Sequence, residues 1–257
     1  MIPYDNITAW GVINPWSSRE QIEQDLLLSK AICDIFSNEF LSNELVFRGG
    51  TALHKLILPR PYRYSEDLDF VRTSAGGVGN IMKELTELGQ QTGYNVNTKI
   101  GMYPKVFWKT SAQTGRSINI KIEINTYERA SALPITKIPY KIQSEWFAGN
   151  VEVNIFKIEE IAATKLRALY QRAKGRDLFD LWLISNLNYI DVDTVINAFS
   201  TYRPENYTAS KAIDNLNKKL DDNMFKTDIL NLISQDVADY DVNTAAEMVI
   251  ERYLSLL

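Results

Sequence analysis

Two aspartates separated by a single residue form the strongest chemical signal in the chain. Asp67 and Asp69 lie in the run Ser65-Glu66-Asp67-Leu68-Asp69-Phe70, whose pattern is that of a short strand. Residues two apart on a strand point to the same face, so the two carboxylates repel each other unless a cation lies between them. Oxygen-only ligands suit Mg²⁺, which takes water and substrate phosphates as its remaining ligands. The structural alternative is an exposed pair of aspartates at the end of a strand.

A third carboxylate, Glu123, lies on the polar face of an alternating segment. Residues 117–125 place isoleucines on one side and Lys121 and Glu123 on the other, as in a half-buried strand. If this strand neighbours the one that carries Asp67, Glu123 completes a three-carboxylate site. Two metal ions there would hold the attacking and leaving oxygens of an in-line phosphoryl displacement. The alternative is a cross-strand ion pair between Glu123 and Lys121 or another basic residue.

Two glycines precede these acids in the sequence. Gly49 and Gly50 lie between a short apolar strand and a helix that opens with Thr51. Glycine lets a backbone approach a ligand closely and a helix start offers free N–H groups, so such a corner can hold phosphate. Ser65 shares the face of the two aspartates and is a second candidate phosphate contact. A structural turn, with Thr51 as a helix cap and Ser65 as a turn cap, is the alternative.

Two charged residues interrupt apolar helical faces in the C-terminal part. Lys165 lies in the middle of the apolar stripe of a helix over 157–172, and Asp180 lies in a segment that is apolar nearly all round. Because burying a lone charge is costly, we expect Lys165 and Asp180 to meet. Asp180 would then orient Lys165 toward phosphates, or the two would form a buried structural ion pair. Asp177 has the position of a helix N-cap.

The elements that must position these residues follow from periodicity. A capping-box pattern, Ser17 to Glu20, precedes a helix over about 18–40. The next expected elements are strand 44–48, helix 51–58, strand 66–72, helix 78–92, and strands 94–99, 103–110 and 117–126. From about residue 157 onward the chain is almost all helical. We therefore expect an α+β protein, with a mixed sheet and flanking helices followed by a helical C-terminal region.

Composition and charge exclude several classes of protein. Of the 257 residues only His54 is a histidine and only Cys33 a cysteine, which disfavours His-dependent, thiol-dependent and thiolate-zinc sites. No stretch approaches the roughly 18 apolar residues of a membrane span, and no secretory leader is visible, so we expect a cytoplasmic protein without a membrane partner. Residues 99–176 hold 14 basic and 6 acidic side chains, whereas residues 177–257 hold 6 and 14. A basic middle segment suits a partner with phosphates, and a solvated surface is the alternative.

Together these motifs resemble the AbiEii/AbiGii toxin family of bacterial nucleotidyltransferases, a distant branch of the DNA-polymerase-β-like superfamily. The matching pieces run in the family's order from Phe47 to Trp182. They are Gly49-Gly50-Thr51-Ala52-Leu53, Arg63-Tyr64-Ser65-Glu66-Asp67-Leu68-Asp69-Phe70, Lys121-Ile122-Glu123-Ile124, Lys165-Leu166-Arg167-Ala168-Leu169 and Arg176-Asp177-Leu178-Phe179-Asp180-Leu181. Residues 183–257 match no motif that we recognise.

The resemblance implies a nucleotidyltransferase domain over 1–156 and a helical domain over 157–257 that supplies Lys165 and Asp180 to the cleft. It implies Mg²⁺, with Mn²⁺ as a substitute, and an NTP substrate. The implied metal ligands are Asp67, Asp69 and Glu123, the implied nucleotide contacts are Gly49, Gly50, Thr51, Ser65 and Lys165, and the implied catalytic residues are Asp67, Asp69, Glu123, Lys165 and Asp180. It also implies a toxin–antitoxin or abortive-infection system of phage defence, with a cognate antitoxin that need not bind the toxin directly.

The expected reaction is transfer of an NMP from an NTP to an RNA hydroxyl, with the 3′ end of tRNA as the acceptor, which would block translation. The basic middle segment would guide the RNA backbone. One alternative uses the same metal site to modify a protein or a small hydroxyl compound. The other is a non-catalytic nucleotide- or RNA-binding partner, whose carboxylates pair with Arg48, Arg60 or Arg63.

Overall fold

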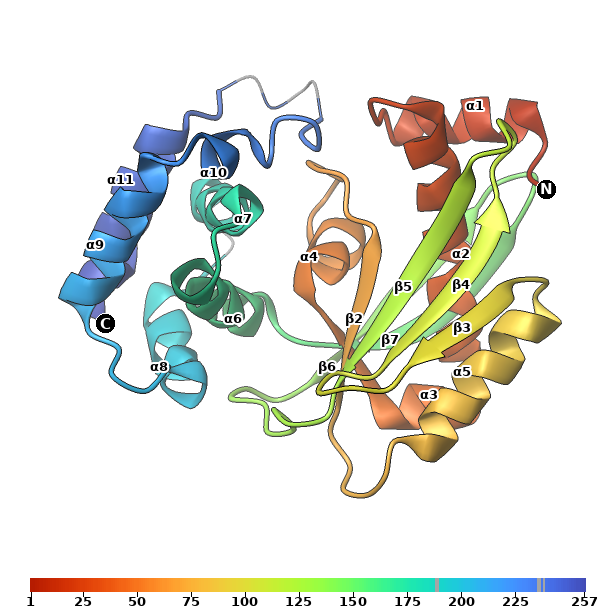
Figure 1. The fold of residues 1–257 in the computed structure, drawn as a ribbon, viewed down its shortest axis with the longest axis horizontal. Helices are drawn as coiled ribbons and strands as arrows, with labels where there is room; N and C mark the ends of the chain where they lie inside the picture. The colour runs from red at the N-terminus through yellow and green to blue at the C-terminus, as the bar shows by residue number, and fades with distance from the viewer. Residues whose placement is uncertain (188–189, 235–236, 238) are drawn as a thin grey trace. The chain divides into compact units, whose positions relative to one another are not determined.

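The computed structural model describes residues 1–187, 190–234, 237 and 239–257 (Figure 1). The chain divides into two compact units. The first consists of residues 1–130 and 135–156, and the second of residues 131–134 and 157–257. The first unit combines a sheet with helices and the second is helical, which confirms the expected α+β class.

The first unit, described throughout, is built on a seven-stranded mixed sheet in the order β3-β4-β5-β2-β1-β7-β6. Its central strand, β2 (Asp67–Arg72), is parallel to β5 (Ser117–Asn125) and antiparallel to β1 (Leu45–Arg48). The remaining strands are β3 (Asn95–Lys99), β4 (Lys105–Ser111), β6 (Thr136–Gln143) and β7 (Ala148–Ile155). The order brings two strands far apart in sequence, β2 and β5, side by side at the centre of the sheet.

Strands β6 and β7 are absent from the sequence-based expectation, which left residues 136–155 unassigned. They form an antiparallel pair at one end of the sheet, and β7 joins β1 in parallel. Pro139 lies within β6. Proline cannot donate to a strand ladder and is tolerated on an edge strand, which is where β6 lies.

The long N-terminal helix, α2 (Arg19–Ser37), begins one residue later than predicted. Its capping box joins Ser18 to Gln21, with Gln21 N donating to Ser18 Oγ at 3.2 Å and Ser18 N donating to Gln21 Oε1 at 3.3 Å. The Ser17–Glu20 box was therefore wrong. The helix also ends before residue 40, because Asn38 turns to an extended conformation and caps α3 (Glu39–Glu44).

The other helices of this unit position the glycine corner and cover the sheet. Helix α4 (Gly49–Ala52) follows β1 directly and continues into a π-helical turn, η1 (Leu53–Ile57), which stops before Pro59 as expected. Helix α5 (Gly79–Gln91) matches the prediction, whereas α1 (Tyr4–Ile13) was not predicted.

Burial separates the two faces of the central strands. On one face the ring of Phe70 packs against Phe36 of α2 and stacks on Phe47 of β1, with centroids 6.0 and 5.0 Å apart. Phe70 is opposite Ile124 in the β2–β5 register, and the isoleucines of β5 are at most 2% exposed. The alternation of a strand then places Asp67, Asp69 and Glu123 on the other, half-buried face.

The second unit packs helices around its own core. The helices are α6 (Ile158–Gln171), α7 (Gly175–Asn186), α8 (Val192–Tyr202), α9 (Ala209–Leu220), α10 (Asn223–Thr227), α11 (Val242–Arg252) and a short 3-10 turn, η2 (Leu254–Leu256). Asp191, Asp222 and Asp241 accept backbone hydrogen bonds at the starts of α8, α10 and α11. Part of the acidic excess of this region is thus used in helix capping. Across the described residues, none of the helices has the length and apolar character needed to span a bilayer.

Candidate active site

The register of three strands brings the predicted carboxylates together. Asp69 is opposite Glu123 across the β2–β5 pair and opposite Arg48 across the β1–β2 pair. Asp67 is opposite Lys121. The expectation that Glu123 lies on the strand beside Asp67 and Asp69 is therefore confirmed by the strand pairing.

The positive charges around these carboxylates come from the sheet itself. Lys121 Nζ lies 2.7 Å from Asp67 Oδ2 and 3.8 Å from Glu123 Oε2. Lys105 Nζ, on the next strand, lies 3.0 Å from Glu123 Oε2. The cross-strand ion pair that the sequence offered as an alternative for Glu123 is thus present. A divalent cation would compete with these two lysines for the same oxygens.

Asp69 carries the clearest electrostatic signature of the group. Burial, reinforced by repulsion from Asp67 and Glu123, raises the pKa of the Asp69 carboxyl above its usual value, and Arg48 and Lys121 only partly oppose this. A carboxyl in this situation gains from a bound divalent cation, which stabilises its charged form. The donor set, three carboxylates on adjacent strands, fits Mg²⁺ in composition. Within the described part of the chain, however, no group of three or more His, Cys, Asp or Glu side chains is already arranged around a metal position.

The glycine corner accommodates side chains of the protein itself. Gly49 has a φ of +82°, and a Cβ there would lie 2.8 Å from Asp69 Oδ2. A Cβ on Gly50 would lie 2.3 Å from Arg63 Nη2 and 3.1 Å from Ser65 Oγ. Glycine is needed at both positions because β2 and the preceding loop press against the start of α4.

Thr51 and Ser65 are tied into the same corner. Thr51 is 1% exposed, and its hydroxyl lies 2.8 Å from Ser65 Oγ and 2.5 Å from the carbonyl oxygen of Asp67. These hydrogen bonds fasten the loop before β2 to α4 and so fix where Asp67 begins its strand. The sequence offered the two hydroxyls either as nucleotide contacts or as caps of a structural turn, and the hydrogen bonds observed here are structural.

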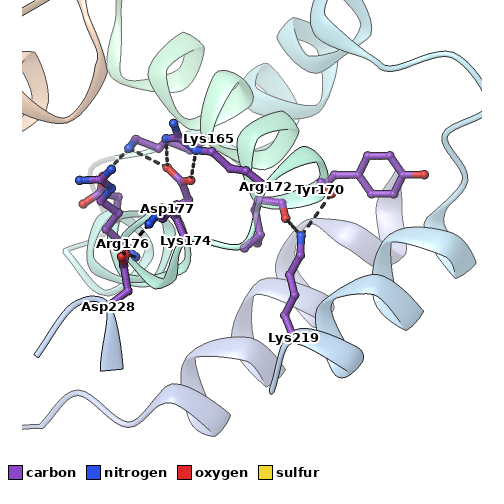
Figure 2. Close-up of polar contacts among 10 residues, drawn as sticks. Lys165, Tyr170, Arg172, Lys174, Arg176, Asp177, Lys219 and Asp228 are labelled. Atoms are coloured by element: carbon purple, nitrogen blue, oxygen red, sulfur yellow. Dashed lines mark hydrogen bonds and ion pairs between the residues drawn. The ribbon is translucent and has the colours of Figure 1, made fainter. Parts of the chain in front are cut away.

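In the second unit, Lys165 meets Asp180 as the sequence predicted. Lys165 Nζ lies 2.7 Å from Asp180 Oδ2 and 3.0 Å from Asp177 Oδ1. The Lys165 side chain is 7% exposed and both aspartates are fully buried. The lysine therefore contacts two carboxylates at once. Its contact with Asp177 is among the polar contacts drawn in Figure 2.

Asp177 has a different role from the predicted one. Helix α7 starts at Gly175, its N-cap is Lys174, and Asp177 lies inside the first turn, so the N-cap assignment was wrong. Asp177 Oδ2 accepts from Arg172 Nε at 2.8 Å (Figure 2). Burial acts to raise the pKa of Asp177, but Lys165 and Arg172 outweigh it and hold this pKa below its usual value. A sequence signal existed: Asp177 and Asp180 are three apart and so share one helical face.

Lys219, which the sequence analysis did not identify, caps the C-terminal end of α6. Lys219 Nζ donates to the carbonyl oxygens of Leu169 and Tyr170, the latter at 3.2 Å (Figure 2). Burial lowers the pKa of Lys219 to about 8, partly offset by Asp177. A cation at a helix C-terminus offsets the helix dipole and satisfies carbonyls that lack helical partners.

The predicted site residues are divided between the two units. Asp67, Asp69, Glu123, Gly49, Gly50, Thr51 and Ser65 belong to the first unit, and Lys165 and Asp180 to the second. Within the first unit, the glycine corner and the carboxylates form one group of neighbours. Sequence reasoning missed Lys105, because its partner Glu123 is set by strand register. It named Arg63 as a possible partner of the carboxylates and did not foresee its packing against Gly50.

The chain has a glycine-flanked helix start beside paired strand carboxylates, in a mixed sheet followed by helices. The comparisons with known proteins show that this is a nucleotidyltransferase fold. The family model described as nucleotidyl transferase AbiEii toxin, of type IV toxin–antitoxin systems, matches residues 30–248. The chain belongs to this family, which confirms the resemblance seen in the motifs. The match also extends through most of residues 183–257, where no motif was recognised.

The solved structure of a nucleotidyltransferase toxin agrees with this fold. MenT4, a nucleotidyltransferase toxin from Mycobacterium tuberculosis H37Rv, is 18% identical and superposes with a TM-score of 0.68, covering 100% of this chain and 91% of that one. An antigenic nucleotidyltransferase-like protein from Paracoccidioides brasiliensis is 17% identical, with a TM-score of 0.44 over 73% of this chain and 92% of that one. No curated protein matches the sequence significantly.

Proposed function

We propose that this toxin transfers an NMP from an NTP to a hydroxyl group of RNA, and that the acceptor is the 3′ end of tRNA. The main support for the proposal is the arrangement of Asp67, Asp69 and Glu123 on adjacent strands, beside the glycine corner formed by Gly49 and Gly50. Membership of a nucleotidyltransferase family supplies the reaction class. RNA as the acceptor is supported by the basic composition of residues 99–176.

In the proposed reaction the RNA hydroxyl oxygen attacks the α-phosphorus of the NTP. The bond from this phosphorus to the oxygen that bridges to the β-phosphate breaks, and pyrophosphate leaves. Asp67 and Asp69 would hold Mg²⁺ or Mn²⁺, which when bound offsets the charge of the triphosphate. Glu123, which is opposite Asp69 in the sheet, would bind a second metal ion or accept the proton that the RNA hydroxyl loses.

We assign Lys165 a role toward the phosphates, with Asp180 as the residue that orients it. Two buried carboxylates hold its ammonium group, so a phosphate would have to replace one of them as its partner. The setting we propose is the bacterial cytoplasm, where NTP and tRNA occur together. A cognate antitoxin would counteract the growth arrest and need not contact the toxin, as in abortive infection against phage.

The experiment that tests the reaction incubates the purified chain with each α-labelled NTP, Mg²⁺ or Mn²⁺, and total RNA. We expect labelled RNA of tRNA size, and a fall of at least about 100-fold in Asp67→Asn and Asp69→Asn. Lys165→Gln should also lose labelling, and its folding is checked by circular dichroism. Asp5→Asn, an exposed aspartate on α1, is the matched control and should label RNA normally.

Two outcomes would contradict the proposal. Labelled protein or small molecule in place of RNA would favour the alternative acceptor and remove the RNA assignment. Unchanged toxicity in a folded Asp67→Asn, Asp69→Asn double variant would favour a non-catalytic binding protein.

A further inference from the structure

An exposed cluster of apolar and aromatic side chains lies at one end of the sheet in the first unit. Ile100 is 83% exposed and Met102 is 64% exposed, and both lie in the turn between β3 and β4. Tyr127, 64% exposed, follows β5. The rings of Tyr103 and Tyr127 meet edge to face, with centroids 6.0 Å apart and planes at 84°. We call these four residues the aromatic patch; exposed apolar patches on soluble domains commonly mark binding surfaces.

The aromatic patch continues directly from the strands that carry the carboxylates. Lys105 is paired with Glu123 across β4 and β5, and Ile124 N donates to the carbonyl oxygen of Pro104 at 2.9 Å. Tyr103, between β3 and β4, thus lies two residues from the lysine that contacts Glu123. The turn between β3 and β4 lies beside the end of β5 (Figure 1).

Hydrogen bonds fix the segment after β5 in place. Asn125 Oδ1 accepts from Tyr127 N at 2.9 Å, and Asn125 Nδ2 donates to Glu128 Oε2 at 2.7 Å. The same Glu128 oxygen accepts from Arg48 Nη1 at 3.2 Å, and Arg48 is opposite Asp69 in the sheet. A series of hydrogen bonds through Asn125 and Glu128 therefore links the backbone of Tyr127 to Arg48, which is the neighbour of Asp69 in the sheet.

The charges at the edge of the patch suit an anion. Lys99 is exposed at the end of β3 and Arg129 is half-buried just after Tyr127. Arg129 Nε donates to the carbonyl oxygen of Thr126 at 2.7 Å, and neither cation has a carboxylate partner in the parts of the chain that the structure describes. Two cations beside an exposed aromatic ring are the combination used for single-stranded nucleic acid.

From this we infer that the aromatic patch binds the single-stranded end of the RNA acceptor. A terminal base stacks on Tyr127, the ring of Tyr103 holds Tyr127 in position, and Lys99 and Arg129 contact the backbone phosphates. The inference rests on the proposed function, because it assigns the patch to the acceptor of that reaction. RNA is favoured over a protein partner because Lys99 and Arg129 have no carboxylate partner among the described residues and lie within two residues of the exposed side chains of Ile100 and Tyr127.

The test measures the binding of a fluorescein-labelled, single-stranded oligoribonucleotide of about 8 nucleotides to the full chain by anisotropy. Tyr127→Ala should raise Kd about 5- to 100-fold, because one stacked base is lost. Tyr127→Trp should bind as the wild type does. Lys99→Gln should reduce the slope of log K against log salt by about 0.7, the loss of one phosphate contact. Tyr4→Ala, an exposed tyrosine on α1, is the matched control.

RNA transfer by the wild type, measured alongside, separates this inference from the proposed function. If the wild type labels RNA but Tyr127→Ala binds and labels like the wild type, the patch assignment is wrong and the function stands. If the wild type neither binds nor labels RNA, the RNA acceptor itself is wrong and the assignment fails with it. If Tyr127→Ala keeps RNA binding but loses binding to the purified antitoxin, the patch is a protein docking surface and the inference is overturned.

Discussion

At Gly50 the absence of a side chain is a requirement of packing. The position a Cβ would occupy lies 2.3 Å from Arg63 Nη2, and Arg63 is itself 2% exposed, so its guanidinium has little room to move aside. The same contact packs the loop that precedes β2 against α4, and this packing fixes the position at which β2 begins with Asp67.

We therefore expect Gly50→Ala to lower the free energy of unfolding by about 1–3 kcal/mol, the usual cost of overpacking. Urea denaturation would measure it. Gly77→Ala is the matched control, because nothing lies within 4 Å of a Cβ at that position and its φ is not positive. A loss equal to that of Gly77→Ala would show that Arg63 moves away without cost.

Individual site residues were predictable where their own pattern carried the information. The spacing of Asp67 and Asp69 fixed their common face, and the apolar stripe around Lys165 predicted its burial and its pairing with Asp180. Partners that depend on strand register were not predictable. Lys105 reaches Glu123 only because β4 pairs with β5 in one particular register, and the local sequence of β4 does not encode it.

The α6–α7 pair is held by charges inside an apolar interface. Lys165 on α6 faces Asp177 and Asp180 on α7, and Arg172 approaches Asp177 from the end of α6. Burying charged groups is costly, so the packing of α6 on α7 is stable only while each buried charge keeps its ion-pair partner. We therefore expect the stability of the helix pair to depend on pH.

Asp177→Asn should reduce stability at pH 7 by about 3–5 kcal/mol, the cost of breaking a buried ion pair. The pKa of Asp177 is lowered on folding, so its contribution is fully present above the unfolded pKa of about 3.9 and is lost as pH falls through the folded pKa. The difference between wild type and variant should therefore shrink below about pH 4. Urea denaturation at several pH values would measure it, with Asp214→Asn, an exposed aspartate on α9, as the control. A difference that stays constant to pH 2.5 would exclude this account.

Helices and strands were predicted correctly where the apolar periodicity of the sequence was strong. The prediction failed where this periodicity was weak or where a local hydrogen bond ended the element. Helix α5 and strand β5 were predicted within a residue or two, because each has a clean apolar face. Strands β6 and β7 were missed: β6 contains Pro139, and half of the inward-facing alternate positions of the pair are only partly buried. Helix α2 ended early because Asn38 caps the next helix, a local hydrogen bond that overrides the continuing apolar pattern.

At the scale of the whole chain, a short segment between two strands of the first unit belongs to the second compact unit. Residues 131–134 follow the β5 end of the first unit but pack within the second. The carboxylate of Glu160, fully buried in the first turn of α6, accepts from Ala132 N at 2.7 Å and from Leu133 N at 3.3 Å. The hydroxyl of Tyr202 donates to the same carboxylate. Sequence periodicity predicted a single domain boundary near residue 156. It could not predict that residues 131–134 belong to the second unit, because four irregular residues have no periodic pattern.

Glu160→Ala should therefore loosen residues 131–134 and weaken the α6–α8 contact in the second unit. It leaves two backbone N–H groups and one hydroxyl without their acceptor, at about 1–3 kcal/mol for each group that stays unsatisfied and buried. Limited proteolysis followed by mass spectrometry should show faster cleavage between residues 130 and 135. Glu159→Ala, the partly exposed neighbour on the same helical turn, is the control and should be cleaved at the wild-type rate. Equal cleavage rates in the two variants would mean that apolar packing, rather than the Glu160 carboxylate, holds the segment in place.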